Sequence, residues 1–281
     1  MNIPRIHHYT NIESLALILE SRKLRFNRLD RVDDLREAQK HQGIEFGKYF
    51  FVSCWTHAQS ESIPQWHMYT DKMAGVRISL PVMPFQRKRF KRGPEWKIRT
   101  KGKLLSPLSN EEHIGRNYFV VPLLVNVENF AGPMKYTKNF KERYAKAVKV
   151  NISPDDPATG TFSRPFDLVR LKSKDWEFQQ EYRFFFFVVP SIWPMPMEAD
   201  PTLFYATLPN DILQQMKRGI APGVKCLDVD LSGQALDEMT RRKHARYDAV
   251  CGDAGWRFLP LIADCFAAFC PAGRTTRLVG Y

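Results

Sequence analysis

The sequence lacks the short motifs that identify the commonest catalytic sites. It contains no Gly-x-Gly-x-x-Gly, no Gly-x-x-x-x-Gly-Lys, no His-Glu-x-x-His and no Gly-x-Ser-x-Gly. The first two motifs hold nucleotide phosphates, the third binds zinc, and the fourth presents a nucleophilic serine. The sequence therefore gives no support to the common nucleotide-binding, zinc-protease and serine-hydrolase classes, and we expect no metal site.

Cysteine is scarce, and long apolar runs are absent. The five cysteines are an odd number and contain no Cys-x-x-Cys pair, which favours a reducing compartment over a disulfide framework. No apolar run approaches the length of a membrane span, and polar residues such as His7 and His8 stand where a signal peptide needs an apolar core. We therefore expect a cytoplasmic protein that does not enter a membrane.

Acidic residues are fewer than basic ones. The chain has 42 Lys and Arg against 30 Asp and Glu, a formal net charge of +12, which favours a polyanion such as nucleic acid or an acidic protein as partner. The positive charge is densest between residues 86 and 103, where Phe90 and Trp96 are interleaved with the basic residues. Such a stretch is either a solvated surface or a nucleic-acid contact. Its candidate contact residues are Arg87, Lys88, Arg89, Lys91, Arg92, Lys97 and Arg99.

The hydrophobic pattern predicts many short strands and a few helices without regular β-α alternation. This pattern indicates an α+β fold rather than a doubly wound sheet. Thr10 and Glu13 are spaced as a capping box and predict the start of a helix over residues 11–21. Further helices are expected over 139–150 and 210–218, and strands over 49–55, 75–80, 119–127 and 203–208.

The segment from Lys172 to Val189 is the most informative stretch of the chain. If it is one strand, alternate side chains share a face, so Gln179, Glu181 and Arg183 lie together. From Phe184 onwards both faces are apolar, as in a strand buried within a sheet. The pattern therefore predicts a rigid strand that presents a carboxylate and a guanidinium at its polar end.

An ordered set of motifs resembles a bacterial family of unknown function. Its members open with His-Tyr-Thr, continue through a Phe-x-Ser-Cys-Phe-like strand and a Trp-x-x-Tyr segment, and carry Trp-x-Tyr-Glu-x-Glu-x-Arg. The counterparts in this chain are His8-Tyr9-Thr10, Phe51-Val52-Ser53-Cys54-Trp55, Trp66-His67-Met68-Tyr69 and the stretch from Trp176 to Arg183, followed by a late Ile220-Ala221-Pro222-Gly223 turn.

That family is in turn similar to the ADP-ribosyltransferase fold, which includes toxins held in check by antitoxins. The resemblance implies an α+β fold of split mixed and antiparallel β-sheets with flanking helices, forming a single domain over residues 1–281 with a basic insertion around 82–118. It implies an NAD-dependent mono-ADP-ribosyltransferase of a toxin–antitoxin or antiphage system, acting on RNA or DNA with RNA favoured, and an antitoxin or chaperone protein as a partner. It also implies Glu181 and Gln179 as catalytic residues, and His8, Tyr9, Thr10, Ser53, Trp66, Tyr69 and Arg183 as residues that bind NAD.

Each of these candidates also has a structural explanation. His8 fits a hydrogen-bonded histidine beside a helix, Trp66 and Tyr69 fit packed aromatics, and Glu181 with Arg183 fits pairing with neighbouring strands. Gln179 stands where the family has a glutamate and cannot take a proton from an acceptor. The alternative function is a non-catalytic component of a defence complex that binds nucleic acid or a partner protein.

Overall fold

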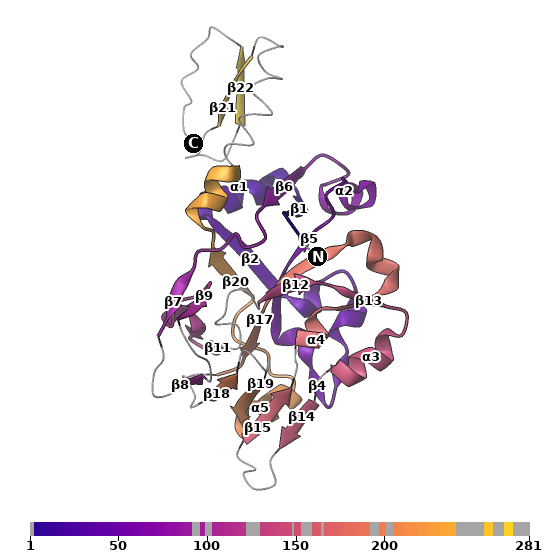
Figure 1. Cartoon of the computed structure of the whole chain (residues 1–281), viewed down its shortest axis with the longest axis vertical. Coiled ribbons are helices and arrows are strands. Elements are labelled where there is room, and N and C mark those ends of the chain that lie inside the picture. Colours follow the sequence, from indigo (N-terminus) through magenta and orange to yellow (C-terminus); the bar gives the residue numbers. More distant parts are fainter. Residues whose placement is uncertain are drawn as a thin grey trace. The chain divides into compact units, whose positions relative to one another are not determined.

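The protein has a mixed α+β fold in which most strand pairs are antiparallel (Figure 1). The computed structural model describes residues 3–91, 96–98, 103–121, 130–147, 149–152, 159–163, 166–191, 197–200, 205–239, 256–260 and 267–271. The chain separates into two compact units, each discontinuous in sequence. Unit one comprises Met1–Lys23, Ser60–Phe85 and Asp230–Tyr281; unit two comprises Leu24–Gln59 and Gln86–Val229.

In unit one, an antiparallel strand pair lies beside two helices. Strand β1 (Ile6–Thr10) pairs with β6 (Val76–Leu80), and Ile6, Ile78 and Leu80 are buried. Helix α1 (Ile12–Ser21) follows β1 in the chain, and helix α2 (Ile63–Tyr69) contacts β1. Strands β21 (Trp256–Pro260) and β22 (Ala267–Pro271) form a separate antiparallel pair.

The predicted helix over residues 11–21 is confirmed, but its cap is not Thr10. The backbone amide of Ser14 donates to Asn11 Oδ1 at 2.8 Å, so Asn11 is the N-cap. Thr10 is the last residue of β1 and is buried. An Asn side chain with an extended backbone serves a helix N-terminus as well as a threonine does, and Thr10 is held in the β1–β6 ladder.

Unit two is built around strand β17 (Glu181–Val189). It pairs antiparallel with β5 (Phe50–Thr56) on one side and with β12 (Ala131–Pro133) and β11 (Tyr118–Val120) on the other. Every residue of β17 is buried, which confirms the predicted buried strand. Strand β2 (Lys23–Arg28) pairs with β5 and with β20 (Cys226–Asp230), and β10 (Ile114–Gly115) pairs with β11.

Phenylalanine rings from several elements anchor β17. The Phe186 ring lies 5.0 Å from that of Phe26 on β2 and 5.5 Å from that of Phe130, and Phe130 also lies 5.3 Å from Phe184. All four side chains are fully buried or nearly so. Because each such ring contributes roughly 2 kcal/mol on burial, the apolar end of β17 fixes the position of its polar start.

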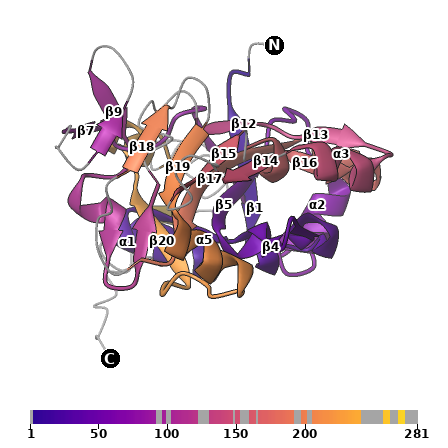
Figure 2. The ribbon, with the colours of Figure 1, turned by 90° about the horizontal axis from the view of Figure 1, so that it is seen from below.

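Smaller sheets and helices complete unit two (Figure 2). Strand β13 (Lys135–Thr137) runs parallel to β16 (Leu171–Ser173), and helices α3 (Phe140–Ala147) and α4 (Phe166–Val169) pack nearby. Another sheet contains, in order, β14 (Lys149–Ile152), β15 (Thr159–Ser163), β19 (Tyr205–Pro209), β18 (Met197–Asp200) and β8 (Trp96–Ile98). Helix α5 (Asn210–Lys217) follows β19. The short pairs are β3 (Lys40–His41) with β4 (Ile44–Glu45), and β7 (Lys88–Phe90) with β9 (Leu104–Ser106).

The described part of the basic insertion contains a buried histidine. His113, in a 3-10 turn over Glu111–His113, contacts the Val120 carbonyl through Nδ1 at 2.9 Å and Ser106 Oγ through Nε2 at 3.2 Å. Its ring packs edge-on against Phe90, 5.0 Å away between centroids. Burial lowers the pKa of His113 to about 4, so the imidazole is neutral in the folded state near pH 7.

We predict that His113 makes the protein sensitive to acid. Its pKa is lower in the folded state than the ordinary value of 6.5, so its stabilising contribution is complete above pH 6.5 and is lost as the pH falls from 6.5 to about 4. Wild-type protein should lose about 2 kcal/mol of its free energy of unfolding between pH 7 and pH 5 from this group alone. Urea titrations of wild type and His113→Leu at both pH values measure the difference. His67→Gln, at an exposed position on α2, is the control, and an unchanged pH dependence in His113→Leu would contradict the prediction.

Candidate functional site

The backbone before Glu181 turns sharply, and the predicted continuous strand over 172–189 is wrong in its first half. After β16, residues Lys174–Gln179 form the 3-10 helix η7, and Gln180 is left-handed, with φ 42° and ψ 51°. Ser173 Oγ donates to Asp175 Oδ2 at 2.9 Å, a local turn contact that starts the 3-10 segment instead of extending the strand. Only Glu181 and the residues after it belong to β17.

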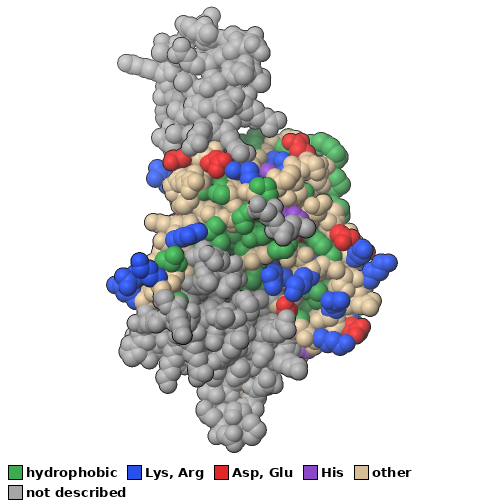
Figure 3. All heavy atoms as spheres, viewed as in Figure 1, with side chains coloured by type: hydrophobic (Ala, Val, Ile, Leu, Met, Phe, Trp, Pro, Cys, Tyr) green, Lys and Arg blue, Asp and Glu red, His purple; other side chains and the backbone are tan. Residues whose placement is uncertain are grey.

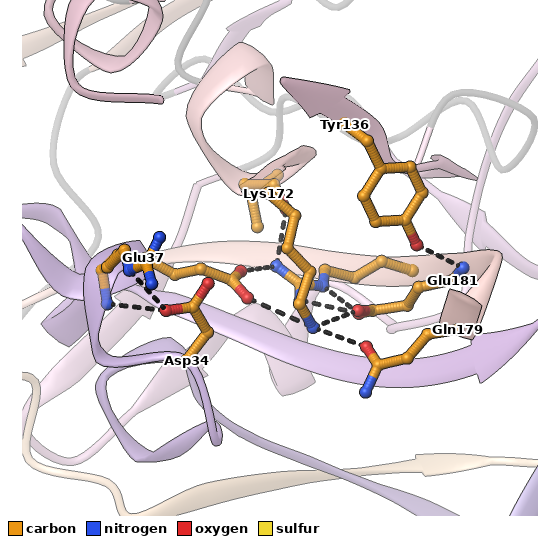
Figure 4. A network of polar contacts seen from close by, with 9 residues as sticks. Asp34, Glu37, Tyr136, Lys172, Gln179 and Glu181 are labelled. Carbon is orange, nitrogen blue, oxygen red and sulfur yellow. Dashed lines mark hydrogen bonds and ion pairs between the residues drawn. The ribbon is translucent and has the colours of Figure 1, made fainter. Parts of the chain in front are cut away.

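The predicted shared face of Glu181 and Arg183 is confirmed. Arg183 donates to Glu181 Oε1 through Nε at 2.7 Å, and its Nη2 lies 2.6 Å from the same oxygen. The amide of Glu181 donates to the Tyr136 hydroxyl at 2.7 Å, which fixes the start of the strand (Figure 4). Both charged side chains are buried, with 4 % of Glu181 and none of Arg183 exposed.

Two further charges complete a buried network, which Figure 4 shows from close by. Lys172 Nζ on β16 donates to Glu181 Oε2 at 2.7 Å and to Gln179 Oε1 at 2.8 Å. Glu37, on the 3-10 helix η2 (Leu35–Ala38), accepts from Arg183 Nη1 and lies 3.4 Å from Lys172 Nζ. The four charged residues Glu37, Lys172, Glu181 and Arg183 are balanced, two of each sign, and we call them the charge network.

Glu181 is ionised within this network. Burial by itself would raise the pKa of Glu181, but the charges of Arg183 and Lys172 outweigh it and lower the pKa to about 2. At Glu37 burial has the greater effect and raises the pKa above the ordinary value. Burial also raises the pKa of the Cys54 thiol, which hydrogen-bonds Glu181. The Cys54 thiol is therefore neutral near pH 7.

Sequence reasoning missed Glu37 and Lys172 as members of the site. The Asp- and Arg-rich composition of residues 28–39 predicts a solvated loop or the start of a helix, yet Asp34 and Glu37 are buried, with 5 % and 1 % exposed. Lys172 is also buried, and its ammonium lies 5.0 Å from the centroid of the Trp176 ring. A carboxylate in an Asp- and Arg-rich loop has no local pattern that indicates burial.

The predicted NAD-binding residues are divided between the two units. His8, Tyr9, Thr10, Trp66 and Tyr69 lie in unit one, on β1 and α2. Glu181, Gln179, Arg183 and Ser53 lie in unit two, where the network joins the first three. The expectation that the two groups line one NAD cleft stays a prediction.

Several of these residues have structural contacts of their own. The Tyr9 hydroxyl accepts from the Ser62 amide at 3.0 Å, and its buried ring packs edge-on against Trp66 at 5.1 Å. Ser53 is buried, and its hydroxyl accepts from Trp55 Nε1 at 3.0 Å. His8, Trp66 and Tyr69 are the candidates in unit one that keep partly exposed surface.

The basic stretch is described only in part. Arg87, Arg89 and Lys91 are exposed, whereas Lys88 contacts both carboxylate oxygens of Glu112 at 2.7 Å. Phe90 is buried against His113, so it does not serve as a platform for a base. Arg92 and Arg99 lie outside the described residues, and so does the side chain of Lys97 on β8.

Comparison with known proteins identifies no relative of this chain. No family model, no curated protein and no solved structure matches the sequence or the fold. Within the described ranges, no group of His, Cys, Asp or Glu side chains is arranged to hold a metal ion. No helix among those residues is both long enough and apolar enough to cross a bilayer.

We predict that opening the charge network destabilises unit two strongly. Arg183→Leu leaves Glu37 and Glu181 buried with Lys172 as their one remaining cation, and breaking a buried ion pair in this way costs about 3–5 kcal/mol. Denaturant unfolding should show this loss. Arg143→Leu, at an exposed position on α3, should stay within about 0.5 kcal/mol of wild type. Equal stabilities for the two variants would show that the network contributes little.

Proposed function

We propose that the protein is an NAD-dependent mono-ADP-ribosyltransferase that modifies nucleic acid, with RNA favoured. The observation that carries the proposal is the ionised carboxylate of Glu181, held at the start of the central strand beside the amide of Gln179. The resemblance of the ordered motifs to an ADP-ribosyltransferase-like family supports it. The setting would be a toxin–antitoxin or antiphage system, in which an antitoxin protein restrains the activity.

A fixed carboxylate suits this chemistry. When nicotinamide leaves NAD, positive charge develops on the ribose, and an ionised carboxylate near the 2'-hydroxyl stabilises that charge, as in glycoside hydrolysis. Lys172 and Arg183 hold Glu181 ionised and in one orientation. Because both oxygens of Glu181 already accept hydrogen bonds, contact with a ribose requires Lys172 or Arg183 to share its acceptor.

NAD would supply the ADP-ribosyl group, and the chain offers residues of suitable chemistry for part of it. Glu181 and Gln179 fit the reacting ribose, and the partly exposed His8, Trp66 and Tyr69 fit the ribose and nicotinamide contacts that the resemblance implies. The buried Tyr9 and Ser53 hydroxyls already have partners and fit a supporting role better. Gln179 can orient an acceptor but cannot take its proton, so another base is required.

We predict that Glu181→Gln abolishes transfer of labelled ADP-ribose from NAD to RNA. The substitution keeps the shape of the side chain and removes its charge, and losing one such electrostatic contact reduces the rate about 10²- to 10³-fold. Gel analysis of RNA incubated with purified protein and labelled NAD measures the transfer.

The matched control is Glu20→Gln, which removes an exposed carboxylate of α1. It should keep wild-type activity. Thermal unfolding of both variants separates lost chemistry from lost folding. Wild-type transfer that survives Glu181→Gln in folded protein would remove Glu181 from the proposed mechanism.

A second candidate function is nucleic-acid binding without catalysis. The pairing of both Glu181 oxygens within the charge network favours it, because such a carboxylate is fully accounted for as a structural group. The exposed Arg87, Arg89 and Lys91 at strand β7 would then contribute phosphate contacts. This protein would bind RNA or DNA in a strongly salt-dependent way and consume no NAD.

For this second candidate we predict that an Arg87→Ala, Arg89→Ala, Lys91→Ala variant binds RNA with a weaker salt dependence. Three lost phosphate contacts would reduce the slope of log K against log salt by about 2 for single-stranded RNA. Fluorescence anisotropy titrations between low and physiological salt measure the slope. Affinity that does not vary with salt in wild type would exclude this role for β7.

A further inference from the structure

An aromatic pair lies on the outer side of η7, next to the charge network. Trp176 and Phe178 are stacked, with ring centroids 6.2 Å apart and 27° between the ring planes. Phe178 is 42 % exposed, which is unusual for an aromatic ring that the core could have buried. The inner partner is fixed, because Lys172 Nζ lies 5.0 Å from the Trp176 centroid while it donates to Gln179 and Glu181.

Elements close to η7 carry positive charge, whereas η7 itself carries the exposed Asp175 and Glu177. Helix η7 contacts β13, and α3 follows β13 in the chain and contacts β16. Residues 135–147 contain five Lys or Arg and one acidic residue. Figure 3 shows Lys and Arg side chains on the side of unit two where β13 and α3 lie in Figure 1.

Part of this charge is unneutralised among the described residues. Lys135 pairs with Asp167 at 3.2 Å, and Lys146 with Glu142 at 2.6 Å. Lys138, Lys141 and Arg143 are exposed and have no ion pair with a described residue. Because Phe140 and Tyr144 form the buried face of α3, Lys141 and Arg143 flank that face on its two edges.

We propose that the surface formed by η7, β13 and α3, the basic–aromatic surface, binds single-stranded nucleic acid. Phe178 stacks on an unpaired base, and Lys138, Lys141 and Arg143 contact the backbone phosphates. Exposed aromatics combined with a cationic surface are the features that bind single strands, because every base offers a face for stacking. An acidic protein would use the charges but would have no need of the stacked rings.

This inference rests on the proposed function in one respect, because it names a single-stranded nucleic acid as the acceptor. Lys172 links the stacked rings to Gln179 and Glu181 within one unit. A strand on the basic–aromatic surface is therefore bound beside the proposed catalytic carboxylate. The sequence does not reveal this surface, because the cations of residues 138–143 and the aromatic pair of η7 lie in separate segments of the chain.

The test measures binding without NAD, using a fluorescein-labelled single-stranded RNA of eight nucleotides, the same sequence as a duplex, and a labelled eight-residue polyglutamate peptide. Wild type should bind the single strand most tightly. Lys138→Ala, Lys141→Ala, Arg143→Ala should weaken that binding at least tenfold. Phe178→Ala and Phe178→Leu should each weaken it about tenfold, since leucine retains apolar volume without a stacking face.

A matched variant with Arg116, Arg218 and Lys225 changed to alanine removes three exposed cations elsewhere in unit two and should bind nearly as wild type does. Equal losses in the two triple variants, or wild-type binding by Phe178→Leu, would overturn the inference. Tighter binding of polyglutamate or of the duplex than of the single strand would overturn it as well. Single-strand binding with no transfer from NAD would refute the proposed function and support this inference, so the two failures are distinct.

Discussion

The ion pair of Arg183 with Glu181 Oε1 is the interaction on which the rest of unit two depends. Two charges of opposite sign stand two residues apart on a fully buried strand, where each alone would carry a large desolvation penalty. Arg183 has further hydrogen-bonding groups to satisfy, and the Val169 carbonyl and Glu37 accept from its Nη1. The guanidinium therefore fixes the positions of β17, of η2 and of the end of α4.

This requirement explains the arrangement of the surrounding segments. Adding Glu37 to the Arg183–Glu181 pair leaves an excess of negative charge, and Lys172 on β16 restores the balance. Strand β16 can reach this position because it pairs in parallel with β13, and the hydroxyl of Tyr136 on β13 accepts from the Glu181 amide. A buried network of this kind is weak evidence for stability in itself, but it specifies which elements meet.

The sequence predicts strand β17 and its Glu181–Arg183 face, but it does not predict that Glu37 and Lys172 join them. Alternation placed Glu181 and Arg183 on one face, and the run from Phe184 to Val189 predicted the buried strand, because both signals are local. Glu37 lies far from Glu181 in the chain, and Lys172 lies on another strand. The sequence pattern around a charged residue in a polar segment is the same whether its side chain is buried or solvated. Periodicity also extended the strand back through Trp176 and Phe178, because alternating aromatics fit a strand as well as the irregular turn of η7 that is present.

The turn before β17 separates the buried side chain of Gln179 from the exposed ring of Phe178. The left-handed Gln180 ends η7, so that Gln179 points inward to Lys172 while Phe178 stays exposed. Lys172 contacts both sides, since its ammonium donates to Gln179 and Glu181 and also faces the Trp176 ring. A ligand that draws Lys172 towards the aromatic pair would free Glu181 Oε2, while Arg183 would still hold Oε1 and keep the carboxylate ionised. Arg183 is fully buried and donates to three separate acceptors, so its displacement would disrupt β17. Lys172 is thus the cation whose displacement exposes Glu181 Oε2 and leaves β17 in place.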